Sequence, residues 1–358
     1  MPDFTGGGIH GLPSETRSIG DTSFDQRIHD LVRDYGCNSS SNWIQEMIVT
    51  ALKIGHDGLG EADLKLFNRS LRELRYSARV FSKYTDRQKV VVFGSARTPA
   101  DAPEALAAEE FGRKMREKGY MIITGGGDGI MGAAQRGAGR ENSFGLNIRL
   151  PFEQHANAVI TGDPKLINFN YFFTRKLNFV KETHAVALFP GGFGTMDEGF
   201  EVLTLMQTGK ARILPMVFVD QPEGTYWKAF FTFLEKHLCG HGLVSPDDFN
   251  LFRLFTNVDD AIAEILQFYR NYVSYRWVRK QLVLRLKKAL TPKALSELNR
   301  EFADLLVSGD IVACGPLPEE MNQPEIANLP RLVLTPHRHN LGRLRLLIDA
   351  INRAPTLG

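Results

Sequence analysis

A nine-residue segment combines a glycine-rich turn with carboxylates: Pro190-Gly191-Gly192-Phe193-Gly194-Thr195-Met196-Asp197-Glu198. It follows an apolar run at 185–189 and opens a segment with helical periodicity. A strand, a glycine turn and a helix start together present free backbone N–H groups and a positive helix end to a phosphate. Here a carboxylate is expected in the first turn of that helix, beside the phosphate. This arrangement indicates chemistry on a phosphorylated small molecule rather than binding alone.

Thr195 and Glu198 also fit a capping box, in which both side chains accept hydrogen bonds from backbone N–H groups at a helix start. A plain cap does not need three glycines in four positions, because each glycine costs backbone entropy. We therefore favour a ligand site over the cap. Glu201 lies three residues after Glu198, so both carboxylates share one helix face and could orient a water and hold a sugar hydroxyl.

Two further turns and one basic pair are candidate parts of this site. Thr124-Gly125-Gly126-Gly127-Asp128-Gly129 and Gly94-Ser95 each follow an apolar run. Neither has the dinucleotide or P-loop pattern, and each is also compatible with a plain tight turn. Arg175-Lys176 lies on an expected helix. The arginine fork suits phosphate or carboxylate, and a solvated surface pair is the alternative.

Short apolar runs alternate with helical segments through the middle of the chain, which predicts an α/β fold with a parallel sheet covered on both faces. The expected strands are 89–93, 121–123, 144–150, 185–189 and 213–219. Ligands of such sheets bind beyond the carboxyl ends of the strands. The glycine turns follow the first, second and fourth of these strands, so we expect them to meet at one rim.

Further segments precede and follow this region in the sequence. We expect a flexible lead-in and helical extension at 1–86, a nucleotide-binding catalytic domain at 87–272, and a C-terminal α/β extension at 273–358. The segment 259–288 reads as mostly helical with a basic face, and 314–330 as a proline-rich connector. The basic stretch fits nucleic acid or a regulatory nucleotide, but a solvated or oligomer-lining face is the simpler interpretation.

Composition narrows the classes of function. The chain has 358 residues, 43% hydrophobic residues and a net charge of +2, typical of a globular protein rather than a general nucleic-acid binder. Its three cysteines lie far apart, and no apolar run has the length of a signal or membrane segment, so we expect a cytoplasmic protein. The histidines lack metal-ligand spacing. We expect no metal, no cofactor, no membrane partner and no nucleic-acid partner.

The motifs resemble those of the LOG ("Lonely Guy") family, formerly labelled lysine decarboxylase-like. The matching pieces are 190–198, Thr124-Gly-Gly-Gly-Asp-Gly-Ile-Met-Gly132 and Arg175-Lys176, within a region spanning about residues 88–270. The resemblance implies a Rossmann-like doubly wound sheet and a homodimer or higher homo-oligomer. It also implies hydrolysis of the N-glycosidic bond of nucleoside 5′-monophosphates, giving free base and ribose 5-phosphate. AMP or a cytokinin riboside monophosphate is then the expected substrate.

Position by position, the resemblance implies that Gly191–Thr195 hold the phosphate with help from Ser95 and the 124–129 turn. Glu198 would orient the attacking water and stabilise an oxocarbenium-like centre, as carboxylates do in glycoside hydrolases. Arg175 would contact the substrate and position Glu198.

Two departures from the family pattern affect this reading. Short family members carry Met-His-x before Arg-Lys, whereas Phe172-Phe173-Thr174 stands here, which bears on base preference. The chain is also extended at both ends. Two other readings keep the same phosphate site without catalysis: a nucleotide sensor, or a carrier of a phosphorylated cofactor. Decarboxylation has no support, because no Schiff-base lysine with an acidic partner can be recognised.

Overall fold

The computed structural model describes residues 18–37, 41–150, 155–320 and 326–357. They fall into two compact units that divide between Tyr76 and Ser77. Within the described residues, none of the helices combines the length and the apolar character needed to cross a lipid bilayer.

The N-terminal unit is helical, as predicted. It contains α1 (Thr22–Asp34), α2 (Ser41–His56) and most of α3 (Glu61–Phe81). The Asp21 carboxylate caps α1 by accepting hydrogen bonds from the N–H groups of Ser23 and Phe24 at 2.8 and 3.1 Å. This satisfies two of the backbone donors that a helix start leaves unpaired.

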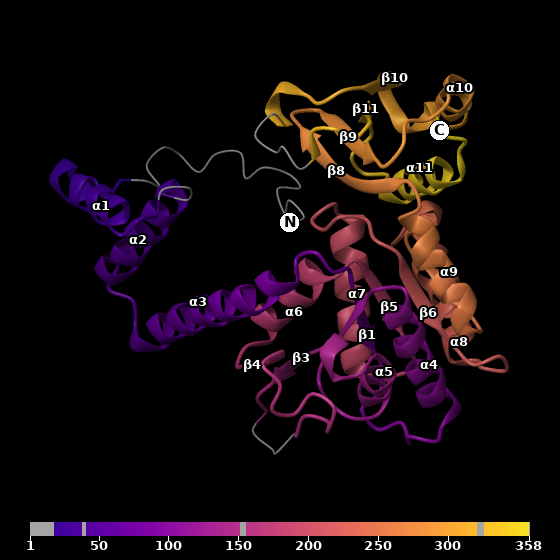
Figure 1. Cartoon of the computed structure of the whole chain (residues 1–358), viewed down its shortest axis with the longest axis horizontal. Helices are drawn as coiled ribbons and strands as arrows, with labels where there is room; N and C mark the ends of the chain where they lie inside the picture. The colour runs from indigo at the N-terminus through magenta and orange to yellow at the C-terminus, as the bar shows by residue number, and fades with distance from the viewer. Residues whose placement is uncertain (1–17, 38–40, 151–154, 321–325, 358) are drawn as a thin grey trace. The chain divides into compact units, whose positions relative to one another are not determined.

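The second unit is built on a seven-stranded parallel sheet with the order β4-β3-β2-β1-β5-β6-β7 (Figure 1). The predicted α/β class and parallel sheet are confirmed, and β4 and β7 are additional to the strands expected from the sequence. Both are short, with four and three residues. The strands are β1 (Lys89–Phe93), β2 (Met121–Thr124), β3 (Ser143–Ile148), β4 (Leu166–Phe169), β5 (Ala185–Leu188), β6 (Met216–Val219) and β7 (Arg253–Phe255).

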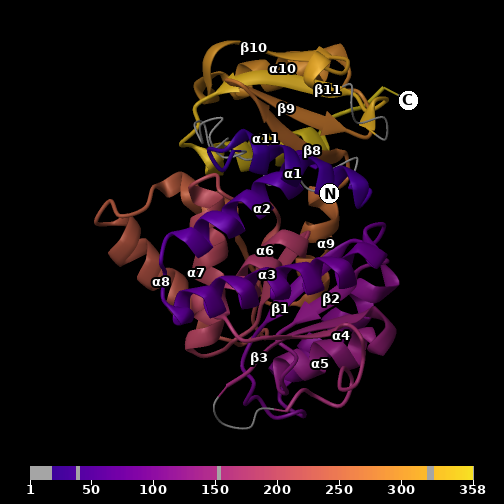
Figure 2. The ribbon, with the colours of Figure 1, turned by 90° about the vertical axis from the view of Figure 1, so that its left-hand side faces the viewer.

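Alternate residues of the strands face two separate helical layers. In β1, Val91 and Phe93 belong to one apolar core, and Val90 and Val92 belong to the other. Helices therefore cover both faces of the sheet, as Figures 1 and 2 show. The first core takes side chains from α6 (Phe172–Glu182), α7 (Phe193–Gln207) and α8 (Tyr226–Phe233), and the second from α4 (Pro103–Glu117), α5 (Ile130–Ala138) and α9 (Val258–Phe268).

The order of the strands places a topological switch between β1 and β5. The chain runs outward from β1 through β2, β3 and β4, and then returns to pair β5 with the other side of β1. A crevice forms where the connections leave in opposite directions, and ligands of open α/β sheets bind there. The turns after β1 and β5 flank this point.

A second sheet follows, antiparallel and four-stranded, with the order β10-β11-β9-β8. It carries α10 (Pro292–Glu301) and α11 (Leu341–Arg353), which confirms the predicted C-terminal α/β appendage. Its strands are β8 (Tyr272–Val278), β9 (Gln281–Leu286), β10 (Leu306–Cys314) and β11 (Arg331–Pro336).

The prediction of a mostly helical segment at 259–288 is wrong beyond α9. Residues 272–286 form a hairpin in which Val278 pairs with Gln281 across a two-residue turn. Arg279 occupies that turn with φ of 56°. Aromatic and β-branched residues favour a strand in 272–278, and Leu282, Leu284 and Leu286 pack in the core on the opposite strand. The expected connector at 314–330 also begins on β10, because Cys314 pairs with Arg331.

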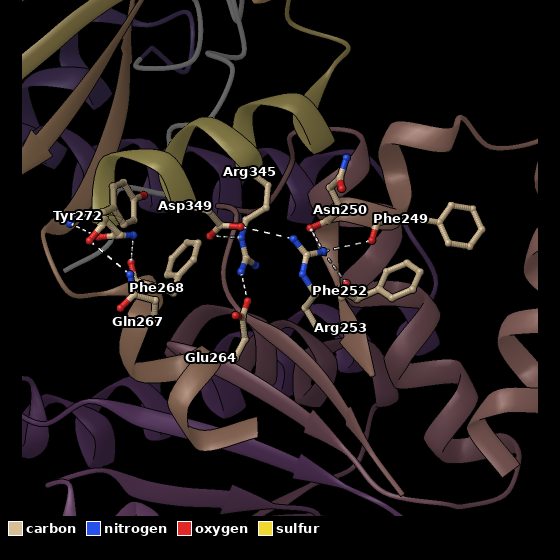
Figure 3. A network of polar contacts seen from close by, with 11 residues as sticks. Phe249, Asn250, Phe252, Arg253, Glu264, Gln267, Phe268, Tyr272, Arg345 and Asp349 are labelled. Carbon is tan, nitrogen blue, oxygen red and sulfur yellow. Dashed lines mark hydrogen bonds and ion pairs between the residues drawn. The ribbon is translucent and has the colours of Figure 1, made fainter. Parts of the chain in front are cut away.

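The two sheets share one apolar core and are joined by a buried ionic network (Figure 3). Arg345 of α11 is fully buried and forms ion pairs with Glu264 of α9 and with Asp349, the latter at 2.9 Å. Its guanidinium lies 4.6 Å from the ring centre of Phe268. Arg253 of β7 reaches Asp349 at 3.5 Å. Helix α11 is therefore anchored to the last strand and last helix of the parallel sheet.

Candidate functional site

The glycine turn after β5 leads directly into α7, as the sequence predicted. Helix α7 begins at Phe193, with Gly192 as its N-cap and no side chain capping it. Among the described residues, no acceptor engages the N–H groups of Gly192, Phe193 and Gly194. Free N–H groups at the positive end of a fifteen-residue helix are suited to an anion such as a phosphate.

The capping-box interpretation of Thr195 and Glu198 is wrong. A capping threonine would have to precede the helix, but Thr195 is the third residue of α7 and Glu198 is the sixth. The helix starts earlier than expected, so Glu198 lies in the second turn rather than the first. Both side chains are buried, each with 6% of the residue exposed.

The glycines of this turn differ in what the surrounding protein requires of them. A Cβ atom on Gly191 would lie 2.1 Å from the Thr195 Oγ1 atom and 2.9 Å from the Ser95 nitrogen. By contrast, nothing lies within 4 Å of a Cβ atom built on Gly192 or Gly194, and neither has a positive φ. Packing within the chain accounts for Gly191 only. A closely approaching ligand would account for the other two.

Ser95 links the three glycine turns at the rim of the sheet. Its N–H donates to the Pro190 carbonyl at 3.1 Å, and its own carbonyl accepts from the Ile130 N–H at 3.0 Å. Gly129, with φ of 62°, packs so closely that a Cβ atom there would lie 2.3 Å from the Ser95 oxygen. A Cβ atom on Gly94 would meet the Ile130 side chain at 2.5 Å. The predicted convergence of these turns is therefore observed.

The carboxylate of Glu198 is paired with the basic residues of α6. Its Oε1 atom lies 3.1 Å from the Arg175 Nη2 atom, and its Oε2 atom lies 3.9 Å from the Lys176 ammonium. Burial raises the pKa of Glu198 to about 7, although both cations oppose this shift. A carboxylate that titrates near neutral pH can exchange a proton at little free-energy cost.

Arg175 and Lys176 face this carboxylate rather than solvent, with side chains 13% and 15% exposed. The solvated-pair interpretation is therefore wrong. The Arg175 guanidinium lies 5.0 and 5.5 Å from the ring centres of Phe172 and Phe179, and its Nε atom is buried without an acceptor. Burial lowers the pKa of Arg175, but an arginine stays charged at neutral pH.

Lys176 holds two further carboxylates of α7. Its ammonium lies 2.7 Å from Glu201 and 2.9 Å from Asp197. Burial opposes the charge on Lys176, but the hydrogen bonds to Glu201 and Asp197 raise its pKa above the ordinary value. The Glu201 side chain is 31% exposed and remains accessible from solvent.

Asn157, which the sequence analysis did not identify as a site residue, supports the 124–129 turn. The Asn157 side-chain amide donates to the carbonyls of Gly126 and Gly127 at 3.0 and 2.9 Å and to Gln135 at 2.6 Å. In a trans peptide the N–H points opposite to the carbonyl, so the N–H groups of Gly127 and Asp128 point away from Asn157. Neither has an acceptor among the described residues. They form a second set of free donors.

The remaining predicted residues support these turns. The Thr124 hydroxyl is buried and accepts a hydrogen bond from the Gly126 N–H at 3.0 Å. A Cβ atom on Gly125 would lie 2.9 Å from the Met131 sulfur. Phe193 is 96% exposed at the start of α7.

The Tyr226 hydroxyl of α8 donates to the Gly191 carbonyl, a contact that no sequence pattern had indicated. In the described part of the chain, no three His, Cys, Asp or Glu side chains gather as a metal site would require.

Comparison with known proteins confirms the resemblance to the LOG family over part of the chain. Residues 131–265 match the family described as "Possible lysine decarboxylase". A "Probable cytokinin riboside 5′-monophosphate phosphoribohydrolase" of Oryza sativa subsp. japonica, LOGL5, is 28% identical over 165 residues, which cover 44% of this chain and 63% of the rice protein. The chain thus spans less than two thirds of that relative. LOG7 of Arabidopsis thaliana is 24% identical over 163 residues, covering 44% of this chain and 72% of the relative.

One of the similar solved structures is a molybdenum cofactor carrier protein from Chlamydomonas reinhardtii. It is 22% identical, with a TM-score of 0.34, over 51% of this chain and 98% of the carrier.

Proposed function

We propose, on the basis of the resemblance to the LOG family, that this protein hydrolyses the N-glycosidic bond of nucleoside 5′-monophosphates. AMP or a cytokinin riboside monophosphate is the proposed substrate, and free base and ribose 5-phosphate are the products. The observation that carries the proposal is the buried Glu198, paired with Arg175 directly behind a glycine turn with free N–H groups. A homo-oligomer is a further proposal from the same resemblance, and a cytoplasmic location is a proposal from the three widely spaced cysteines.

The 5′-phosphate would bind at the start of α7. The N–H groups of Gly192, Phe193 and Gly194 have no other acceptor among the described residues, and those of Gly127 and Asp128 are likewise free. With the phosphate held there, the sugar would extend toward Glu198 and Arg175. Glu201 would hold a sugar hydroxyl, within reach of Lys176.

Glu198 would then act on the anomeric carbon. Its ionised carboxylate would orient a water, take a proton from it and stabilise the positive charge that develops as the bond to the base breaks. The electron pair of that bond leaves with the base. Overall, the hydroxyl of water ends on ribose 5-phosphate and its proton on the base. Arg175 would keep the Glu198 carboxylate oriented, and its own charge would help hold Glu198 ionised.

Chromatography of base release tests this proposal. The protein is incubated with AMP, GMP, CMP, UMP, IMP and isopentenyladenosine monophosphate, with adenosine as the unphosphorylated control. Base and ribose 5-phosphate from a monophosphate, with adenosine intact, would support it. Tight binding without base release would favour the sensor or carrier interpretation instead.

The rate is expected to depend on pH through Glu198. Because the ionised carboxylate is the proposed active form and its pKa is about 7, kcat/KM should rise about tenfold per pH unit below 7 and level off above it. The measurement is kcat/KM for AMP from pH 5 to pH 9.

The substrate phosphate also titrates in this range, so a variant must separate the two ionisations. Lys176→Met removes a cation that lowers the pKa of Glu198, so the midpoint should move to higher pH. The phosphate ionisation is the same for both proteins. An unmoved midpoint would assign the profile to the substrate and contradict this role of Glu198.

Alanine at Gly192 or Gly194 is expected to weaken phosphate binding without loss of stability. The added methyl group meets no protein atom within 4 Å, and it would take up space at the turn where the phosphate is proposed to bind. The affinity for AMP should fall about tenfold or more, which corresponds to a loss of about 1.4 kcal/mol of binding free energy.

Gly191→Ala is the matched comparison, because its methyl group collides with Thr195 and should lower the unfolding temperature. Calorimetry and thermal unfolding measure both effects, and unchanged AMP affinity in both Gly192→Ala and Gly194→Ala would argue against this phosphate site.

A further inference from the structure

A recess of about 290 Å³ lies where α9, β9 and α11 end, away from the glycine turns. Figure 1 shows these elements meeting at the junction of the two sheets. We call it the basic recess, since three cations and no acidic side chain line it. Its polar lining consists of Arg270, Asn271, Lys287, Lys288, Asn352 and Thr356.

The positive charges of the basic recess are not compensated. Arg270, Lys287 and Lys288 form no ion pair with another residue in the described ranges. The Lys287 ammonium donates to the Tyr269 carbonyl, and burial lowers the pKa of Lys287, with no carboxylate acting against this effect. All three residues are exposed, so an anion in the recess would meet cations that no carboxylate of the described residues neutralises.

Side chains engage three of the backbone carbonyls at the recess, those of Phe268, Tyr269 and Lys288. Helices α9 and α11 end here, and the negative ends of helices would otherwise repel an anion. The Asn352 amide donates to the Phe268 carbonyl at 2.6 Å, and the Asn271 amide donates to the Lys288 carbonyl at 3.1 Å. The Lys287 ammonium donates a hydrogen bond to the Tyr269 carbonyl. These contacts leave the charges of Arg270 and Lys288 available to a ligand.

The wall of the recess is also rigid. Asn271 and Asn352 are 5% and 2% exposed, and the Asn352 side-chain oxygen accepts from the N–H groups of both Asn271 and Tyr272 at 2.8 Å. The Asn271 side-chain oxygen accepts from the Lys288 N–H at 2.9 Å. These buried amides fix the backbone from which the cations extend.

We propose that the basic recess is a second binding site, for a small anion that carries two or more negative charges on phosphate groups. The charge of the lining matches such a ligand, and the volume admits a pyrophosphate-sized group. This inference does not depend on the proposed hydrolase activity.

Pyrophosphate is a suitable probe, measured by isothermal titration calorimetry at low salt. The double variant Arg270→Gln/Lys288→Gln is compared with wild type and with Lys293→Gln, which alters an exposed lysine of α10 outside the recess. Lys287 is left in place because it caps α9. Pyrophosphate can also occupy the glycine turns, so Gly194→Asp, which places a carboxylate there, is titrated in parallel.

We expect wild type, Lys293→Gln and Gly194→Asp all to bind pyrophosphate at the recess. The double variant should lose that site or bind at least tenfold more weakly, with an unchanged unfolding temperature. Two results would overturn the inference. One is equal affinity of the double variant and wild type while Gly194→Asp still binds, which would place the ligand at neither site. The other is equal affinity of the double variant and wild type, with binding lost only in Gly194→Asp. That second pattern would leave the phosphate site at α7, and with it the proposed function, intact.

Discussion

Glu198→Gln is expected to reduce base release from nucleoside monophosphates by about 10³-fold, within the range that general acid–base groups contribute. Glutamine has the same shape but can neither accept a proton from water nor offer a negative charge to the developing oxocarbenium centre. Since Glu198 does not cap α7, the helix should persist. The kcat and KM for AMP are measured, and AMP binding is followed separately by calorimetry.

Asp197→Asn is the matched control for this variant. Asp197 lies next to Glu198 on α7 and also pairs with Lys176, but its side chain is 59% exposed. Its neutralisation should change kcat only a few-fold, because an exposed ion pair contributes little. If Glu198→Gln retained more than a tenth of the wild-type kcat, Glu198 would not be the catalytic carboxylate, and the sensor and carrier interpretations would gain support.

Glu320→Gln is expected to lower the free energy of unfolding by about 3–5 kcal/mol. Glu320 is 1% exposed and lies between two buried arginines, with Arg285 Nε and Arg331 Nε both donating to it at 2.8 and 2.7 Å. The substitution leaves two buried guanidinium groups without a counter-charge. Urea unfolding followed by circular dichroism measures the loss. Glu297→Gln, at an exposed glutamate of α10, should change stability by less than about 0.5 kcal/mol.

This cluster also predicts the direction of acid unfolding. Burial alone would raise the pKa of Glu320, but the hydrogen bonds from Arg285, the Leu317 N–H and Arg331 hold it below its ordinary value. Its stabilising contribution is therefore complete above the ordinary pKa and is lost as the pH falls through the lowered value. Glu320→Gln should remove part of the acid sensitivity of the wild type. If the stability of the variant had the same pH dependence, the pairing of Glu320 would not contribute as described.

The parallel sheet could be predicted because its information is local. Each main strand is an apolar run, and a glycine turn follows three of them at the same edge. For the hairpin at 272–286 the local information conflicts, because its basic residues suit a helical face whereas its aromatic and β-branched residues favour a strand. The pairing of the buried Arg285 with Glu320 comes from a distant segment. Tertiary pairing decided the structure there.

In the candidate site, too, features encoded by neighbouring residues were predictable, and contacts between distant segments were not. The glycine turns, Arg175 and Glu198 were recognisable as motifs. The support of the 124–129 turn by Asn157 was not, because its acceptors are carbonyls about thirty residues earlier in the chain, and any residue type supplies a carbonyl. The start of α7 was also misplaced, since without a capping side chain nothing in the residues distinguishes Gly192 from Thr195 as the boundary.

The core shared by the two sheets bears on how this protein could have evolved. The segment that resembles a known family, 131–265, ends on α9, and the Glu264 side chain within it is paired with Arg345 of α11. A gene fragment that encoded only the matched region would leave this carboxylate and the apolar residues of the core without their partners. The matched segment and the C-terminal sheet therefore depend on each other for the packing of this core. Substitutions at 264, 345 and 349 are expected to be inherited together, and exchange of the C-terminal sheet between related genes would be selected against.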